Sequence, residues 1–392
     1  MNILLIHNKY SIYGGEDKIV EQQYNILKKN NNVKVYYRDN NEIRNFSFLS
    51  KIKLFREAYN SKKTISDLLE LIEKFRPDLV HVHNIYPLIS PSIYNFFYER
   101  NIPVVQTLHN YRFICPNGLM FRDGHICDDC LRLSNFRSCI INKCYRESFI
   151  QSLWYSDIIS KANKNKCFDK ISKFVALNDF VKDKMIEKGY KKDLFEIIPN
   201  CIDISYNNCL NKKEDYYIYV GRLSSEKGIL TMMKAFSKLS NVNLKIVGDG
   251  PLKNELKKFI FENNCNNIDL LGFKSGNEKL ELIANAKALI VPSEWYENFP
   301  TVVLEAFSLG TIVIGTSTGG LSYMIKHNYN GYKFNLGDQE GLIEAIKNLN
   351  LDERNIIKLS NNAYNTYINY YSKDIYYNKH IELYNKILAK GE

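Results

Sequence analysis

The sequence predicts an α/β protein made of two doubly wound, Rossmann-like domains, and two observations lead to this prediction. Short apolar runs alternate with helical patterns along the whole chain, which is typical of parallel sheets covered by helices on both faces. The chain has 392 residues, more than one hydrophobic core usually organises, so two domains are expected. A composition of 45% hydrophobic and 24% charged residues fits a globular protein.

The first domain is expected at residues 1–204. Ile3–His7 is typical of a buried strand, and the glycine pair Gly14 and Gly15 then precedes a helical pattern. No G-x-G-x-x-G follows the strand, which disfavours a plain Rossmann dehydrogenase. Paired glycines before a helix let backbone N–H groups approach a phosphate, and an ordinary tight turn is the alternative. The further strands expected here are Val33–Tyr37, Leu79–His83, Val104–Leu108, Phe174–Leu177 and Ile197–Ile198.

The second domain is expected at residues 205–374, after a polar linker at Ser205–Glu214. A helix within 375–392 is expected to pack back on the first domain. Ligands of doubly wound sheets bind beyond the carboxyl ends of the strands, so the active site is expected in a cleft that the two domains face. The strands expected here are Tyr217–Val220, Leu244–Val247, Ile268–Leu271, Ala288–Val291 and Ile312–Ile314.

Two cations stand in the loop after the first strand of the second domain. Arg222 and Lys227 lie five positions apart in a segment bounded by Gly221 and Gly228. Such a pair suits a diphosphate, because fixed cations stabilise the charge that collects on a departing nucleoside diphosphate. Exposed basic loop residues are the alternative for either cation alone.

Two carboxylates, Glu297 and Glu305, stand eight positions apart across the expected start of a helix. Pro300 suits the first helical position, where its missing N–H costs nothing. The helix N-terminus would then attract a diphosphate, one acid could bind sugar hydroxyls and the other a ribose diol. Two solvated surface acids are the alternative.

These motifs occur in the order found in retaining glycosyltransferases of family four, which have the GT-B fold, and the chain resembles that family over nearly its whole length. The motifs of the second domain are Gly221-Arg222-Leu223, Glu226-Lys227-Gly228, Gly248-Asp249-Gly250-Pro251, Leu271-Gly272-Phe273, Pro292-Ser293 and the pair Glu297 and Glu305. Those of the first domain are Gly14-Gly15, 76–84, Thr107-Leu108-His109 and Ile198-Pro199-Asn200.

The resemblance implies a nucleotide-sugar donor, with UDP or GDP as the nucleotide, held mainly by the second domain. Arg222 and Lys227 would bind the diphosphate, Glu297 the sugar hydroxyls and Glu305 the ribose. His109 would lie beside the donor sugar, so the implied catalytic set is His109, Glu297, Arg222 and Lys227. The other residues implied in donor binding are Gly14, Gly15, Asn298, Phe299, Thr301 and Val302.

The implied reaction retains the anomeric configuration and proceeds without a catalytic metal. No obvious covalent nucleophile is present, so we expect same-face transfer in which the departing phosphate accepts the proton of the acceptor. The chain has no Asp-x-Asp pair, the usual arrangement for holding a divalent ion on a diphosphate. His81 and His83 alternate along a strand and stay outside the catalytic set, since they can simply be buried and hydrogen-bonded.

Five of the nine cysteines crowd into an expected insertion at about residues 112–147. The Cys-x2-Cys pair with outlying cysteines has the spacing of a tetrahedral zinc site. We predict a structural zinc there, and reduced, partly buried thiols remain an equal alternative. The predicted ligands are Cys115, Cys127, Cys130 and Cys144, which leaves Cys139 spare.

The net charge of +10 is concentrated in the first half, where Lys and Arg outnumber Asp and Glu by 31 to 22 in residues 1–200. This asymmetry suggests an anionic partner for the first domain. Phe46–Arg56 mixes aromatic and cationic residues as interfacial helices do, and a solvated surface helix is the alternative. With no signal peptide or membrane span in the sequence, we expect a cytoplasmic protein, peripherally associated with the inner face of the membrane.

The predicted function is transfer of a sugar to a glycan or lipid-linked acceptor in surface polysaccharide synthesis. A glycosyl phosphorylase or a sugar-nucleotide epimerase on the same fold is one alternative. A zinc-ribbon protein that binds nucleic acid is another, but it explains only a third of the chain. We therefore expect no nucleic-acid partner.

Overall fold

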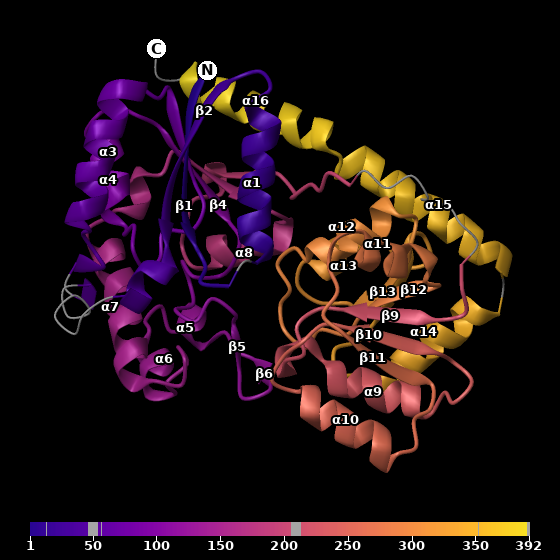
Figure 1. The fold of residues 1–392 in the computed structure, drawn as a ribbon. Coiled ribbons are helices and arrows are strands. Elements are labelled where there is room, and N and C mark those ends of the chain that lie inside the picture. The colour runs from indigo at the N-terminus through magenta and orange to yellow at the C-terminus, as the bar shows by residue number, and fades with distance from the viewer. Residues whose placement is uncertain (13, 46–53, 56, 205–212, 352, 390–392) are drawn as a thin grey trace. The chain divides into compact units, whose positions relative to one another are not determined.

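The computed structural model describes the chain except for residues 13, 46–53, 56, 205–212, 352 and 390–392. Most of the predicted interfacial segment Phe46–Arg56 and of the predicted linker Ser205–Glu214 therefore lies outside the described residues. The chain forms two compact units (Figure 1). Unit 1 comprises residues 1–120, 128–200 and 376–392, and unit 2 comprises residues 121–127 and 201–375.

Unit 1 contains a six-stranded parallel sheet in the order β2-β1-β3-β4-β7-β8. In Figure 1, α3 and α4 lie on one side of this sheet, and α1 and α16 lie on the other. The strands are β1 (Asn2–Lys9), β2 (Asn32–Asp39), β3 (Leu79–Val82), β4 (Val104–Leu108), β7 (Lys173–Ala176) and β8 (Phe195–Ile197). The helices are α1 (Gly15–Leu27), α3 (Lys62–Phe75), α4 (Ser92–Tyr98), α5 (Asp129–Arg132), α6 (Arg137–Ile141), α7 (Phe149–Lys164), α8 (Asp179–Glu187) and α16 (Lys373–Leu388).

Unit 2 contains a second six-stranded parallel sheet in the order β11-β10-β9-β12-β13-β14. Its strands are β9 (Tyr217–Val220), β10 (Leu244–Val247), β11 (Ile268–Gly272), β12 (Ala288–Val291), β13 (Ile312–Thr316) and β14 (Gly331–Phe334). Its helices are α9 (Ile229–Ser237), α10 (Lys253–Glu262), α11 (Gly276–Asn285), α12 (Thr301–Ser308), α13 (Leu321–Met324), α14 (Gln339–Asn350) and α15 (Glu353–Tyr370). Short 3-10 turns occur at η1 (Asn40–Asn45), η2 (Phe168–Lys170), η3 (Lys192–Leu194) and η4 (Ser225–Lys227).

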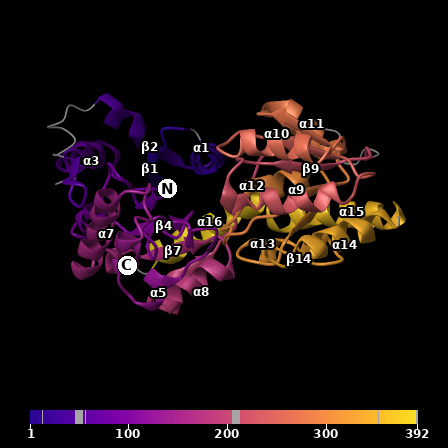
Figure 2. The same ribbon diagram turned by 90° about the horizontal axis from the view of Figure 1, so that it is seen from below.

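The prediction of two doubly wound, Rossmann-like domains is confirmed. Every residue of β3, β4, β12 and β13 is buried, as expected for parallel strands covered on both faces. The sequence prediction missed β14, which lies between α13 and α14 in the chain and forms one edge of the sheet in unit 2 (Figure 2). It also missed the hairpin of β5 (Phe121–Arg122) and β6 (His125–Ile126).

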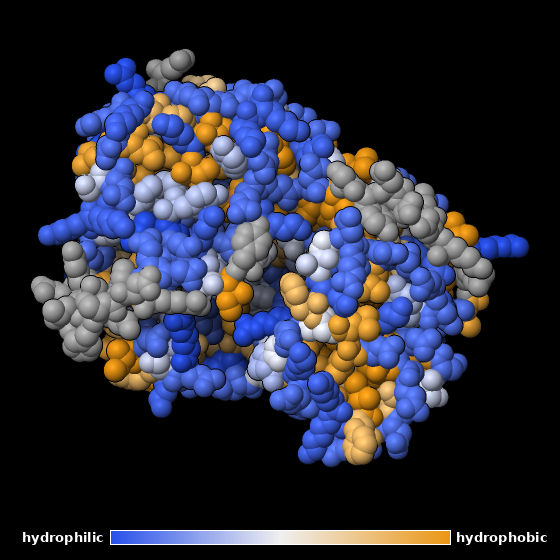
Figure 3. All heavy atoms as spheres, in the orientation of Figure 1, coloured by the Kyte–Doolittle hydropathy of each residue, from blue (hydrophilic) through white to orange (hydrophobic). Residues whose placement is uncertain are grey.

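The final helix, α16, contributes to the core of unit 1. The Tyr384 hydroxyl lies 2.6 Å from Nδ1 of His81 on β3 and accepts a hydrogen bond of 3.2 Å from Gln23 on α1. Among the described residues, no helix is both long enough and apolar enough to cross a membrane. Hydrophilic residues cover most of the surface seen in Figure 3, with smaller apolar areas between them.

Candidate functional site

The two central strands of unit 2 bring the predicted donor-binding loops to one place. β9 and β12 are paired neighbours, and the chain leaves them in opposite directions, β9 toward β10 and β12 toward β13. In open parallel sheets, the carboxyl ends of such strands form the point where ligands bind. The loop of Arg222 and Lys227 follows β9, and the loop of Glu297 follows β12.

Lys227 and Glu297 are in direct contact. The Lys227 ammonium lies 2.6 Å from Oε1 of Glu297, and the Ser293 hydroxyl donates to the same oxygen at 2.7 Å. Glu297 is only 5% exposed, so its carboxylate needs these partners, because a buried charge without them is costly. The Lys227 ammonium also lies 4.9 Å from the centre of the Trp295 ring. The structure therefore places two of the four residues of the predicted catalytic set in direct contact.

Arg222 lies in the same loop, with its side chain exposed. Its carbonyl accepts a hydrogen bond of 2.8 Å from the Tyr219 hydroxyl, which holds the loop against β9. Within the described part of the chain, its guanidinium forms no ion pair. The loop thus offers one cation that is already paired and one that is available to an anion.

Glycines let the loops approach each other closely. A Cβ at Gly228, where φ is +66°, would lie 1.9 Å from the Pro292 carbonyl oxygen, and one at Gly319, where φ is +55°, would lie 2.7 Å from that of Glu297. The Gly320 N–H donates to the Glu297 carbonyl at 2.6 Å. Only glycine fits these two positions without displacing the backbone that carries Glu297.

The helix after Glu297 begins one residue later than predicted. Pro300 is the N-cap, and α12 starts at Thr301. The missing N–H of proline is harmless at either position. Asn298 and Phe299 are buried in the preceding loop, and Thr301 and Val302 are half-buried in the first turn. Glu297 therefore lies just before the helix and Glu305 one turn inside it, as predicted.

Glu305 has a partner that the sequence analysis did not identify. Both of its carboxylate oxygens lie 2.7 Å from the ammonium of Lys279 on α11, and Glu305 is 3% exposed. No motif or spacing in the sequence pointed to Lys279, which lies 26 positions away. The predicted contact of Glu305 with a ribose stays a prediction, and a ribose would share this carboxylate with Lys279.

His109 follows β4 at the carboxyl edge of the sheet in unit 1. Its Nε2 lies 2.8 Å from Nδ1 of His83, and the two rings are stacked with centroids 5.1 Å apart. Burial lowers the pKa of His109, which favours a neutral imidazole at neutral pH. The sequence analysis left His83 out of the catalytic set, and the structure makes it the direct partner of His109.

The glycine pair lies at the start of α1 in unit 1. Gly14 is the N-cap, and its N–H donates to Oδ2 of Asp17 at 2.9 Å. The other oxygen of Asp17 lies 2.9 Å from Nε2 of His7. Burial opposes ionisation of Asp17, but the contacts with His7 and Gly14 are stronger together and lower its pKa. The amide of Gly14, predicted to contact the donor, is thus already bound to a carboxylate.

The cysteine-rich segment places four thiols near one another. Cys139, which the zinc prediction set aside, is hydrogen-bonded to Cys144, and this contact together with burial and the nearby Cys130 and Cys115 raises its pKa. Throughout the described ranges, no group of three or more His, Cys, Asp and Glu side chains is arranged to hold a metal ion. The predicted zinc ligands stay a prediction.

Comparison with known families matches both parts of the chain to glycosyltransferase domains. Residues 28–206 match the family model described as Glycosyltransferase Family 4, and residues 204–366 match the model described as Glycosyl transferases group 1. The two matches adjoin and together span most of the chain.

Two curated relatives illustrate the similarity. An uncharacterised glycosyltransferase of Methanocaldococcus jannaschii is 33% identical over 178 residues, which are 42% of this chain and 50% of that protein. The UDP-Gal:alpha-D-GlcNAc-diphosphoundecaprenol alpha-1,3-galactosyltransferase of Escherichia coli is 26% identical over 221 residues, 50% of this chain and 56% of that protein. The chain thus spans about half the length of these relatives.

Solved structures share the fold. An Anabaena protein, Alr3699/HepE, solved in complex with UDP, superimposes with a TM-score of 0.71 at 16% identity and covers 98% of this chain and 100% of its own. The lipopolysaccharide outer core galactosyltransferase WaaB gives a TM-score of 0.66 at 16% identity, with coverage of 98% and 100%. At this identity the likeness establishes the GT-B fold alone.

Proposed function

We propose that this chain, which carries both domains of a GT-B glycosyltransferase, transfers a sugar from a nucleotide-sugar donor to a glycan or lipid-linked acceptor in surface polysaccharide synthesis. The observation that carries the proposal is the contact of Lys227 with Glu297, beside the available guanidinium of Arg222, at the carboxyl ends of β9 and β12. Two cations and a buried acid at this point suit a diphosphate joined to a sugar.

In the proposed reaction, Arg222 and Lys227 bind the diphosphate and stabilise the charge that it gains as the glycosidic bond breaks. A diphosphate that draws the Lys227 ammonium toward itself leaves Glu297 able to accept hydrogen bonds from sugar hydroxyls. Glu305 and the amides at the start of α12 would bind the nucleoside and phosphate parts. His109, neutral because it is buried, would hydrogen-bond the sugar rather than repel a developing positive charge.

Retention of the anomeric configuration and independence from a metal are parts of the same proposal. Same-face attack requires no enzyme nucleophile, and the leaving phosphate accepts the proton of the acceptor hydroxyl. Relatives support the substrate classes: one is named for a UDP-Gal donor and a diphosphoundecaprenol-linked acceptor, and others for lipopolysaccharide synthesis. The basic first half of the chain supports association with an anionic membrane face.

The test is an activity assay of the full chain with UDP- and GDP-sugars and a lipid-linked saccharide acceptor. We expect one donor to give a glycosylated product whose new linkage, read by NMR, has the anomeric configuration of the donor. Sugar phosphate formed from inorganic phosphate, or an epimerised donor formed without any acceptor, would instead favour the phosphorylase or epimerase alternative.

The structural zinc at Cys115, Cys127, Cys130 and Cys144 stays a prediction. Elemental analysis of the purified protein tests it directly, since one zinc per chain is expected if the thiols rearrange around a metal. Protein that contains no stoichiometric zinc would leave reduced thiols as the account of this segment.

A further inference from the structure

A hollow of about 700 Å³ lies in unit 1 at the carboxyl ends of its strands. Tyr10 follows β1, Tyr86 follows β3 and Arg112 follows β4, and the beginning of α7 supplies a further wall. We call this hollow the carboxyl-edge pocket. Because His109 also follows β4, the pocket opens on the same edge of the sheet as the predicted catalytic histidine.

The Arg112 guanidinium makes few and long hydrogen bonds in this pocket. One terminal nitrogen, Nη1, makes two long contacts, 3.4 Å to the Tyr10 hydroxyl and 3.3 Å to Oδ1 of Asn84. Its Nε is buried without a hydrogen-bond partner, and so is the hydroxyl of Tyr86, a residue only 4% exposed. Glu16 acts on Arg112 electrostatically, but its carboxylate accepts from Tyr10 at 2.8 Å and forms no ion pair with Arg112. A partly buried guanidinium whose Nε is buried without a hydrogen-bond partner is costly, which points to an anion supplied by a ligand.

The charged side chains described in the lining of the carboxyl-edge pocket are all positive. The described residues that line it include two arginines, Arg112 and Arg146, and no aspartate or glutamate. Arg146 is exposed, and its guanidinium lies 5.5 Å from the centre of the Tyr145 ring. Arginine forks suit phosphate oxygens, and the two cations together favour a phosphate or diphosphate.

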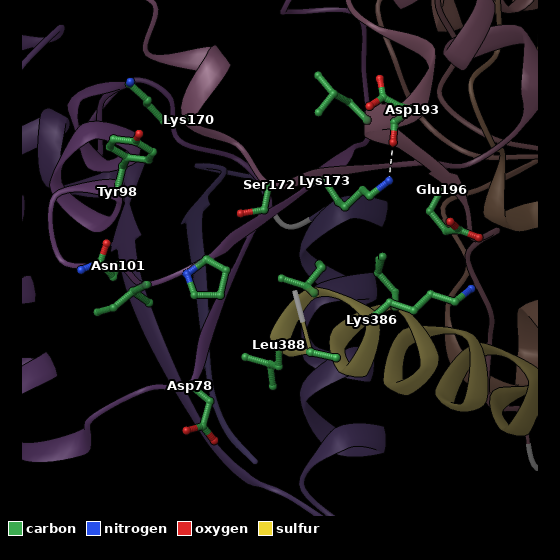
Figure 4. Close-up of a pocket in the computed structure, with 16 residues that line it drawn as sticks. Asp78, Tyr98, Asn101, Lys170, Ser172, Lys173, Asp193, Glu196, Lys386 and Leu388 are labelled. Carbon is green, nitrogen blue, oxygen red and sulfur yellow. Dashed lines mark hydrogen bonds between the residues drawn. The ribbon is translucent and has the colours of Figure 1, made fainter. Parts of the chain in front are cut away.

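A second hollow of unit 1 shows the contrast. It has a volume of about 1250 Å³ and lies at the amino ends of the strands (Figure 4). Its lining mixes acids with lysines, and each lysine has a partner: Lys173 donates to the Asp193 carbonyl, Lys170 lies 4.0 Å from the centre of the Tyr98 ring, and Lys386 pairs with Glu382 at 2.6 Å. No nitrogen of these lysines is buried without a hydrogen-bond partner. The Nε of Arg112 is, although the guanidinium also lies 5.6 and 5.8 Å from the centres of the Tyr10 and Tyr155 rings.

One wall of the carboxyl-edge pocket is apolar and open to solvent. The Phe55 and Trp154 rings pack with centroids 4.5 Å apart, and Phe55 remains 41% exposed. Ile150 on α7 lines the pocket and is 66% exposed, and its neighbours Phe149 and Leu153 are 50% and 46% exposed. Large apolar side chains gathered beside a cationic pocket suit an amphipathic ligand.

We propose that the carboxyl-edge pocket binds the phosphate of a lipid-linked acceptor, with Arg112 and Arg146 as its anion partners and Phe55, Ile150 and Trp154 against its alkyl chain. This inference rests on the proposed function, whose acceptor it specifies. The shared chemistry is a phosphate ester, which could be carried on a lipid or free in solution. The apolar wall favours the lipid.

Calorimetric titration of the full chain tests the proposal without requiring transfer. The probes are geranyl diphosphate, inorganic diphosphate and octyl glucoside, which carries sugar and alkyl chain but no phosphate. The variants are Arg112→Gln, the exposed Arg146→Gln, which should fold normally, and Arg137→Gln as an exposed control on α6. A diphosphate that also binds at Arg222 and Lys227 does so equally in all of them.

We expect geranyl diphosphate to bind Arg112→Gln at least about tenfold more weakly than wild type and Arg146→Gln about threefold more weakly, since charge-assisted hydrogen bonds are lost. Arg137→Gln and the octyl glucoside titrations should be unchanged. Unchanged binding of geranyl diphosphate to both pocket variants would overturn the proposal. So would an equal loss of octyl glucoside binding. If inorganic diphosphate binds wild type as tightly as geranyl diphosphate does, the lipid assignment is wrong.

These outcomes are separate from failure of the proposed function. A chain that transfers no sugar to any acceptor can still show the phosphate-dependent loss in these titrations. Conversely, a chain that glycosylates phosphate-free acceptors equally well with and without Arg112 contradicts the inference and leaves glycosyl transfer intact.

Discussion

At the scale of residues, the proposed donor site contains a charge pair. Lys227 and Glu297 stand 70 positions apart in the chain and are 2.6 Å apart in space. The sequence indicated each residue through its motif, but their contact follows from the pairing of β9 with β12, which no local pattern reveals. Lys279 was missed for the same reason, because only the packing of α11 on α12 brings it to Glu305.

Replacing Glu297 by Gln should lower kcat/KM about a hundredfold, equivalent to about 2.7 kcal/mol, because the amide cannot support the same hydrogen bonds to sugar and Lys227 loses its counter-charge. Initial rates over a range of donor concentrations measure this loss. Glu255→Gln, an exposed position on α10, is the control and should match wild type. Equal rates for Glu297→Gln and Glu255→Gln would remove Glu297 from the catalytic set.

At the scale of elements, most strands were predictable because a strand buried on both faces is an apolar run. β14 was not predicted because Gly331 and Lys333 break the apolar run in a strand of only four residues. The hairpin of β5 and β6 escaped because its strands have two residues each. Helix α12 was placed one residue too early because proline suits both the cap and the first turn.

The approach of the loops after β9 and β12 gives a prediction with a matched control. Gly228 and Gly337 both have positive φ, +66° and +71°. A Cβ added at Gly228 would lie 1.9 Å from the Pro292 carbonyl oxygen, whereas one added at Gly337 would have no heavy atom within 4 Å. Both alanine variants incur about 1 kcal/mol of backbone strain. Gly228→Ala should also displace the loop and weaken donor binding at least about tenfold, equivalent to about 1.4 kcal/mol.

Thermal unfolding and donor titration separate the two effects. Gly337→Ala should lose a little stability and bind the donor as wild type does. If both variants bind the donor equally well, the close approach of these loops does not position the site.

The helix α16 should make the stability of unit 1 sensitive to acid. Burial lowers the pKa of His380 to about 4, with its bond to the Tyr376 carbonyl opposing this slightly. The neutral form is therefore favoured by folding. The contribution of neutral His380 to the free energy of unfolding is fully present above the ordinary histidine pKa of about 6.5. It falls as the pH drops toward 4, and the loss from this group alone is about 2 kcal/mol at pH 5.

Urea unfolding at pH 7 and pH 5 measures this sensitivity. His380→Gln removes the titrating group, so its loss of stability between the two pH values should be smaller than that of wild type by about 2 kcal/mol. His109 remains in both proteins. The pKa values of His81 and His83 are lowered partly by His380, so the difference between the two proteins measures His380 together with its effect on these two rings. Identical losses in the two proteins would show that His380 is not held neutral by the fold.

At the scale of the whole molecule, two parallel sheets with adjoining glycosyltransferase matches establish the GT-B fold. The fold was predictable because the alternation of strand and helix recurs twice along the chain. The substrate was not, because donor and acceptor are selected by pocket shape, which depends on side chains far apart in sequence. Arg112 illustrates this, since only the structure shows that its Nε is buried without a hydrogen-bond partner among the described residues.

The metal independence that we propose concerns the whole reaction. Two cations are proposed to stabilise the leaving diphosphate, so transfer should keep more than about half its rate in excess EDTA. Removal of a catalytic Lewis acid would instead raise the activation barrier by several kcal/mol and nearly abolish the rate. The assay compares rates with EDTA alone and with EDTA plus excess Mg²⁺. A rate abolished by EDTA and restored by Mg²⁺ would contradict a metal-free mechanism.

Calorimetric titration of wild type and Lys227→Met with UDP-glucose and GDP-mannose tests the proposed diphosphate site directly. We expect at least one sugar nucleotide to bind wild type saturably and to bind Lys227→Met at least about tenfold more weakly, since a charge-assisted contact to the diphosphate is lost. Binding of neither compound, or equal binding to both proteins, would contradict a diphosphate site at the carboxyl ends of β9 and β12.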